Sequence, residues 1–203
     1  MAENRPWLSS LTLAGRHVRL DPLTLDHLPA LSAVGLEPDL WRWTLSMISS
    51  EKDMRDYVEA ALAGRARGTE LPFVTIERAS ETVVGSTRYL AAEPAHRRLE
   101  IGSTWIAADW QRTAVNSEAK LLMLGHAFDA LGCNRVEFKT DSLNEKSRRA
   151  LLAIGAVEEG TFRNHMVSQG GRLRHSVYFS IIRDEWPVVR RGLEVRLARH
   201  PNG

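Results

Sequence analysis

One segment in the middle of the chain limits the fold more than any other, because it joins a strand to a long helix through an unusual turn. Residue patterns predict a strand over residues 99–106 and an apolar helix over residues 115–131, ended by the glycine that follows. The connecting stretch, residues 109–120, reads DWQRTAVNSEAK and contains no glycine. Another strand is predicted at residues 135–141. The unit is therefore strand, helix, strand.

The elements on either side of this unit have the patterns of short strands and helices. Strands are predicted at residues 16–20, 73–77, 82–90, 159–167 and 176–182, and helices at residues 25–34, 54–62, 144–154 and 184–200. A strand-helix-strand unit placed among antiparallel strands predicts an α+β protein with a mixed sheet.

Length and composition indicate one soluble globular domain. The 203 residues are 43% hydrophobic and 26% charged, and we expect a single domain over residues 1–203, with a core from about 15 to 186 and a helical tail at 187–203. A net charge of +2 is too small to indicate a nucleic-acid or membrane partner. No apolar run reaches 18 residues and residues 1–6 carry no signal-peptide core, so we expect a cytoplasmic protein.

Metal chemistry is not expected from this sequence. The seven histidines have no metal-ligand spacing, and a single cysteine rules out an internal disulfide. Cys133 follows a glycine at the end of a helical pattern, and we interpret it as a small buried hydrophobe rather than a reactive thiol.

Two short motifs have both a structural and a functional interpretation. The turn before residue 115 opens a helix, whose unpaired N–H groups and partial positive charge favour a phosphate, but a plain strand-to-helix corner is the more general explanation. The second motif, residues 140–147, is a helix start: Ser142 with Glu145 fits a capping box, and Asn144 is an equally good cap. Either motif alone favours the structural interpretation.

Taken together and in order, these motifs are more specific. The ordered set is Leu99-Glu100-Ile101-Gly102, Trp110-Gln111, Ser117-Glu118-Ala119, Asn144 with Ser147, Leu152 with Gly155, and Gly170-Gly171 with Arg174. This set resembles the GCN5-related N-acetyltransferase (GNAT) family, in the branch with the ribosomal-protein alanine acetyltransferases of RimJ/RimL type, from about Gly15 to Trp186. The resemblance implies the GNAT acyl-CoA N-acyltransferase fold, a central twisted mixed sheet flanked by helices, and acetyl-CoA as cosubstrate with no metal.

The turn departs from the pattern of that family. A Gln/Arg-x-x-Gly-x-Gly/Ala pattern wraps the pyrophosphate of coenzyme A there, and this chain has Gln111 first, Ala114 at the first glycine and Asn116 last. Arg112 also occupies a position that is often glycine. A positive φ at Ala114 would cost about 1–2 kcal/mol, while Asn tolerates that region and Arg112 could pair with a phosphate. We expect weakened or rearranged phosphate binding, not its loss.

The resemblance also implies which residues contact the cofactor. They are Thr104, Trp105, Ile106, Gln111, Arg112, Thr113, Ala114, Val115, Asn116, Ser117, Asn144 and Ser147. The strand before the turn would separate from its parallel neighbour, and the pantetheine arm would pair with the backbone of residues 103–107 as an added strand. A backbone N–H there would hold the thioester oxygen. Asn144 would bond the arm, and Ser147 would protonate the leaving thiolate.

An amine must lose a proton to attack, so we looked for a general base. Glu100 is the first candidate, although a solvent-facing or ion-paired strand residue is an equal alternative, and Glu137 is the second, with a structural role favoured. Glu118, in the first turn of its helix, is expected to complement the helix dipole and brace the turn. No residue has the setting of an activated covalent nucleophile, which favours direct attack in a ternary complex.

The acceptor is the least determined part of the prediction. The resemblance implies a primary amine, on a protein N-terminus or a small molecule, bound by loops near residues 36–50 and 164–174. Three tryptophans could shape that cleft, but core packing is favoured for Trp41, Trp43 and Trp105. A homodimer through the last strands or the C-terminal helix is compatible with the sequence. Two alternatives stay open: a non-catalytic module of this fold that binds coenzyme A or a partner protein, and an unrelated nucleotide-binding α/β protein.

Overall fold

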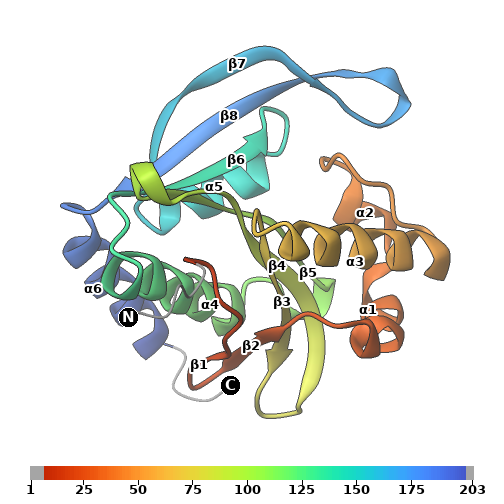
Figure 1. The fold of residues 1–203 in the computed structure, drawn as a ribbon, viewed down its shortest axis with the longest axis horizontal. Helices are drawn as coiled ribbons and strands as arrows, with labels where there is room; N and C mark the ends of the chain where they lie inside the picture. The colour runs from red at the N-terminus through yellow and green to blue at the C-terminus, as the bar shows by residue number, and fades with distance from the viewer. Residues whose placement is uncertain (1–6, 200–203) are drawn as a thin grey trace.

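The computed structural model describes residues 7–199 and is built around one eight-stranded sheet, in the order β1-β2-β3-β4-β5-β6-β8-β7 (Figure 1). The strands are β1 (Leu13–Ala14), β2 (Val18–Pro22), β3 (Leu71–Glu77), β4 (Thr82–Glu93), β5 (Arg98–Ile106), β6 (Arg135–Asp141), β7 (Val157–Val167) and β8 (Leu173–Ile182). Every neighbouring pair is antiparallel except β5 and β6, which are parallel. The predicted α+β fold with a mixed sheet is confirmed.

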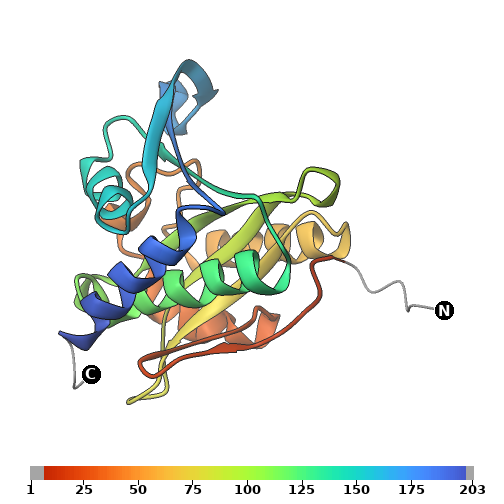
Figure 2. The same ribbon diagram turned by 90° about the vertical axis from the view of Figure 1, so that its left-hand side faces the viewer.

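Helices cover both faces of this sheet. They are α1 (Leu28–Gly35), α2 (Pro38–Trp41), α3 (Glu51–Ala66), α4 (Ala114–Gly125), α5 (Glu145–Ala153) and α6 (Trp186–Ala198). Helices α4 and α6 lie side by side on one face, whereas α1 and α3 lie against β3, β4 and β5 from the other (Figures 1 and 2). Each face has its own apolar core, which for the α3 side includes Met54 and Val58 and for the α4 side Met123 and Leu124.

Three elements of the chain differ from the sequence prediction. The regular part of α4 ends at Gly125, and the last turn predicted for it, His126–Ala130, is π-helical. Strand β1 and helix α2 are too short to show a hydrophobic period and were not predicted. The C-terminal helix was predicted, and as α6 it buries its Trp186 and Leu193 in the α4-side core. Residues 1–6 and 200–203, where a leader and the end of the helical tail were considered, lie outside the described residues.

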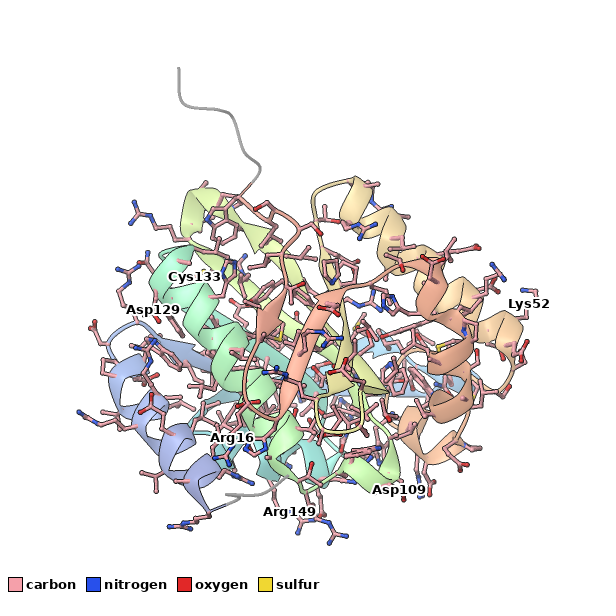
Figure 3. All side chains as sticks on the ribbon, turned by 90° about the horizontal axis from the view of Figure 1, so that it is seen from below. Arg16, Lys52, Asp109, Asp129, Cys133 and Arg149 are labelled. Atoms are coloured by element: carbon pink, nitrogen blue, oxygen red, sulfur yellow. The ribbon has the colours of Figure 1, made fainter. Side chains whose placement is uncertain are left out.

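The single cysteine has the environment expected for it. Cys133 is fully buried, and burial raises the pKa of its thiol to about 11. Figure 3 shows it beyond the C-terminal end of α4 near Asp129, while Asp109 precedes the other end of that helix. The thiol is therefore a packing group remote from the glycine-free turn.

Candidate functional site

The two parallel strands separate shortly after they meet. β5 and β6 pair at three positions only, where residues 98, 99 and 100 face residues 135, 136 and 137. Beyond Glu100 and Glu137, β5 runs on to Ile106 and β6 to Asp141 without pairing with each other. The separated part of β5 therefore has backbone groups on its β6 side that no ladder hydrogen bond satisfies.

A bulge in β5 accompanies this separation. Ser103 has a positive φ of 45°, and the register with β4 shifts between Ser86 and Arg88. Ser103 and Thr104 are exposed although Ile101 and Trp105 on either side of them are buried. Bulges turn a strand away from its partner and re-aim its side chains, which is what this one does beside the opening.

The turn after β5 avoids the strain considered for Ala114. Thr113 caps α4, with its hydroxyl accepting from the Val115 N–H at 3.3 Å and donating to the Trp110 carbonyl at 2.8 Å. Ala114 is consequently already helical, and the positive φ, 64°, belongs to Arg112. Asn116 also lies inside the helix, so its tolerance of left-handed backbone is not used.

The predicted cofactor residues of this turn differ in what they present. Gln111 is engaged within the protein: its Nε2 donates to the Ile106 carbonyl at 2.7 Å, and its Oε1 accepts from Lys146. Arg112 is exposed. The buried side chains of Ala114, Val115, Ser117 and Trp105 leave only backbone groups for a ligand, and Asn116 has a buried Oδ1 without a partner among the described residues.

Lys146, in the first turn of α5, is a cation beside the turn that sequence reasoning missed. Its place two residues after the predicted cap Asn144 was the available signal. Asn144 does cap α5, because its Oδ1 accepts from the Ser147 N–H at 3.0 Å. Ser147 is half-buried. Since α4 follows β5 and α5 follows β6, both helices begin at the same, separated end of the parallel pair.

The two candidate bases are in different environments. Glu100 is buried, its carboxylate lies 3.4 Å from Lys139 Nζ, and burial raises the pKa of Glu100 while Lys139 opposes that shift. Glu137 bridges Arg98 at 3.0 Å and Arg135 at 2.8 Å. These ion pairs favour a structural role for Glu137 and leave Glu100 the better candidate.

Glu118 does not act where it was expected. Its carboxylate accepts from the backbone N–H groups of Arg16, His17 and Val18 at 2.8, 2.6 and 2.7 Å. It therefore anchors the start of β2 to α4 instead of bracing the turn. These three N–H donors satisfy both carboxylate oxygens, which explains why Glu118 can be buried.

A second missed residue, Lys120, points from α4 into the region of the opening. It is buried, its Nζ donates to Thr104 Oγ1 at 3.0 Å, and it lies 5.9 Å from the centre of the Phe138 ring. No carboxylate of the described residues pairs with it, and burial lowers its pKa to about 7. A lysine within an apolar helix pattern was the only hint in the sequence.

The two predicted acceptor loops contact each other. Gln169, in the turn between β7 and β8, donates its Nε2 to the carbonyls of Trp41 and Ser46. Arg172 lies 5.6 Å from the centre of the Trp43 ring and pairs with Asp141. The same hairpin reaches over the α2 end of the molecule in Figure 1.

The tryptophan prediction holds for two of the three residues. Trp41 and Trp105 are buried in the α3-side core, while Trp43 is half-buried between Arg42 and Arg172. Within residues 7–199 no group of three or more His, Cys, Asp or Glu side chains could hold a metal ion. No helix in the described range is long and apolar enough to cross a membrane.

Known proteins match this chain in sequence and in fold. It is 33% identical over 101 residues to "Uncharacterized N-acetyltransferase YoaA" of Bacillus subtilis, covering 50% of this chain and 56% of that protein. It is 34% identical over 95 residues to "Putative ribosomal N-acetyltransferase YdaF" of the same organism, covering 46% and 50%. The matched segments thus span about half the length of these curated relatives.

Fold comparison extends the match to most of the chain. A GCN5-related N-acetyltransferase from Brucella melitensis superposes with a TM-score of 0.85 at 31% identity, covering 94% of this chain and 87% of that one. A family model, the acetyltransferase (GNAT) domain, matches residues 17–157. The expected RimJ/RimL-like branch agrees with the ribosomal name of one relative. With the mixed sheet and its separated parallel strands, these matches show that the chain belongs to the GNAT acetyltransferase family.

Proposed function

We propose that the protein is an acetyl-CoA-dependent N-acetyltransferase that acts on a primary amine. The observation that carries the proposal is the separation of β5 from β6 beyond Glu100, with α4 and α5 both beginning at its open end. Such an opening offers unpaired strand backbone for an extended ligand and helix N-termini for its phosphates. Membership of a family that uses acetyl-CoA supports the same assignment.

The cofactor residues follow from this geometry. The pyrophosphate would lie at the start of α4, where the Arg112 side chain and Lys146 add positive charge to the N–H groups of the first turn. The pantetheine arm would pair with the backbone of residues 103–107. Asn144 would donate its side-chain N–H to the arm, because its Oδ1 is already used as the cap of α5.

The reaction would proceed by direct attack. The neutral amine nitrogen forms a bond to the thioester carbonyl carbon, and Glu100 accepts the proton that the amine loses, directly or through a water. A backbone N–H of residues 103–107 holds the oxygen on which negative charge develops. The carbon–sulfur bond then breaks, and Ser147 donates a proton to the thiolate. The raised pKa of Glu100 makes it a stronger base than an exposed glutamate.

The class of acceptor is narrowed only by the relatives. The ribosomal name of one of them supports a protein N-terminal amine over a small amine. The binding region would lie between the loop after α2 and the β7–β8 hairpin, which Gln169 links. A homodimer and a cytoplasmic location remain predictions from the sequence.

A calorimetric titration tests the cofactor assignment first. We expect saturable binding of acetyl-CoA and of desulfo-coenzyme A, at one site per chain, and no comparable binding of ATP. Arg112→Gln should weaken acetyl-CoA binding about tenfold through loss of a charged phosphate contact, while Arg191→Gln, at an exposed site on α6, should leave it unchanged. No binding of acetyl-CoA would refute the proposal; binding without turnover on any amine would leave a coenzyme A-binding module.

A further inference from the structure

Arg174, on β8, is a buried guanidinium without a hydrogen bond. It is 5% exposed, no described residue accepts a hydrogen bond from its guanidinium, and its Nε is fully buried without a partner. A counter-charge, Asp141, places its Oδ2 4.0 Å from Arg174 Nε, which is too long for a hydrogen bond. A buried donor left in this state is costly, so a group from outside the chain is expected to bind this guanidinium.

Asp141 does not hydrogen-bond Arg174, and each of its oxygens accepts from another donor. Its fully buried carboxylate accepts from Arg172 and from the Leu143 N–H, the latter at 3.0 Å. The other buried arginine of the described residues, Arg88, has an Nε without a partner too, but its Nη1 donates to Glu70 at 2.9 Å. The lack of any hydrogen bond therefore distinguishes Arg174 from the other buried arginine.

Charged side chains of both signs surround Arg174. Asp141 and Glu100 are its carboxylate neighbours and Arg172 is a cationic one, while Lys139 pairs with Glu100. Burial lowers the pKa of Arg174, while Asp141 and Glu100 act on it in the opposite direction. Neither carboxylate hydrogen-bonds Arg174, so a carboxylate from outside the chain would supply the bonds that these two do not make.

The cluster lies on the proposed acceptor side of the sheet. Alternate residues of β8, Val177 and Phe179, are in the α4-side core, so Arg174 lies on the opposite face. Arg172, two residues earlier, reaches the Trp43 ring of the loop after α2. Arg174 is thus near both the candidate base Glu100 and the loops expected to hold the acceptor.

We propose that Arg174 binds a carboxylate of the acceptor, so that this site takes primary amines with a carboxylate close to the amine. This inference rests on the proposed function for the role of the amine. A guanidinium fork binds a carboxylate through two parallel hydrogen bonds, which would satisfy donors of Arg174 that no described residue meets. The carboxylate would come from a free amino acid or from an acidic first residue of a peptide.

Binding of unreactive acetylated products tests the inference without turnover. One pair of probes is N-acetylalanine and N-acetylalaninamide; the other is N-acetyl-Asp-Ala-amide and N-acetyl-Asn-Ala-amide. Each is titrated into the protein alone and with coenzyme A present. We expect the carboxylate member of one pair to bind at least about tenfold more tightly than its amide. The first pair would identify an amino-acid acceptor and the second an acidic peptide.

The preference should depend on one side chain. Arg174→Gln should abolish the acid-over-amide ratio and Arg174→Lys should retain part of it, since charge remains but the fork is lost. Arg191→Gln is the matched exposed control, with the ratio unchanged. Equal binding of acid and amide, absence of binding by all four probes, or a ratio that survives Arg174→Gln would overturn the inference. Failure of the proposed function would instead appear as absence of acetyl-CoA binding or of acetyl transfer to any amine.

Discussion

Replacing Lys120 with methionine should stabilise the protein, by an amount that depends on pH. The lysine is buried against Thr104 and Phe138 without an anionic partner, and burial lowers its pKa from 10.5 to about 7. The folded state therefore favours the neutral amine of Lys120, and the charged amine destabilises the folded state. Methionine has a similar length and no charge, so Lys120→Met removes this opposition.

The magnitude follows from linkage between proton binding and folding. Below about pH 7 the lysine is charged in both states, and the full penalty, at most about 4–5 kcal/mol, acts on the folded state. As pH rises from about 7 toward about 10.5, the unfolded chain holds a proton that the folded chain lacks, so wild-type stability rises by up to about 1.4 kcal/mol per pH unit relative to the variant. Loss of the Thr104 hydrogen bond subtracts about 1 kcal/mol from the variant at every pH.

Urea unfolding at a series of pH values measures this difference. We expect Lys120→Met to exceed wild type by about 2–4 kcal/mol near pH 6, and the excess to shrink by about 2 kcal/mol between about pH 7.5 and 9.5. The control is Lys52→Met, at a highly exposed site on α3 (Figure 3), for which the difference should change little over that range. A variant less stable than wild type at low pH, or a difference independent of pH, would refute the reasoning.

Four further predictions concern the site and its support. Glu100→Gln should lower kcat by about 10²–10⁴-fold while acetyl-CoA affinity is kept. The activity of the wild type should fall as pH drops through the Glu100 pKa, which lies above the usual glutamate value. A variant with the rate and pH profile of the wild type would remove Glu100 from the mechanism. Asn144→Asp should keep the cap of α5 but weaken acetyl-CoA binding, measured by titration. Asn144→Ala should weaken binding too and also lose about 1 kcal/mol of stability, measured by urea unfolding. Normal acetyl-CoA binding by the aspartate variant would contradict the role of Asn144. Arg112→Gly should relieve up to about 1 kcal/mol of left-handed strain yet bind the cofactor less tightly, and a loss of stability would argue against strain at that residue. Glu118→Gln should cost about 2 kcal/mol of unfolding free energy, because three backbone donors then share fewer acceptor sites. An unchanged urea midpoint of unfolding would show that Glu118 does not anchor the start of β2.

The fold was predictable wherever an element was long enough to repeat its own pattern. The bounds of β6 match the predicted residues 135–141, and the β3–β4 hairpin and the helix start at Asn144 follow from local residue chemistry. Strand β1 and helix α2 have two and four residues, too few for any period. The π-helical turn after Gly125 also has no simple sequence signal, since the apolar pattern continues through it.

The glycine-free turn shows where local reasoning reached its limit. Residue types indicated that some position would need left-handed backbone, but the position depends on where α4 begins. Thr113 sets that point as the cap, which makes Ala114 helical and moves the positive φ to Arg112. Ala114 therefore carries no strain, and the cost falls on Arg112, which also stands where the family often has glycine and whose exposed side chain could meet a phosphate.

The burial of Lys120 and Arg174 could not be predicted from the sequence, and the physical reason is the same for both. In sequence each is a charged residue beside apolar ones, and the usual inference is that such a side chain faces water. Both are nevertheless buried, Lys120 on the α4 side of the region where β5 leaves β6 and Arg174 on the opposite face. Around the gap between the separated strands, each of these buried side chains has an incomplete set of partners: Lys120 has a threonine hydroxyl and no carboxylate, and Arg174 has a carboxylate 4.0 Å away and no hydrogen bond. Unbalanced polar groups should then gather on both faces of such a gap, one set facing the cofactor and the other the acceptor. Under the proposed function, the incomplete pairing of Lys120 and Arg174 is what we expect of a site whose remaining partners are its two substrates.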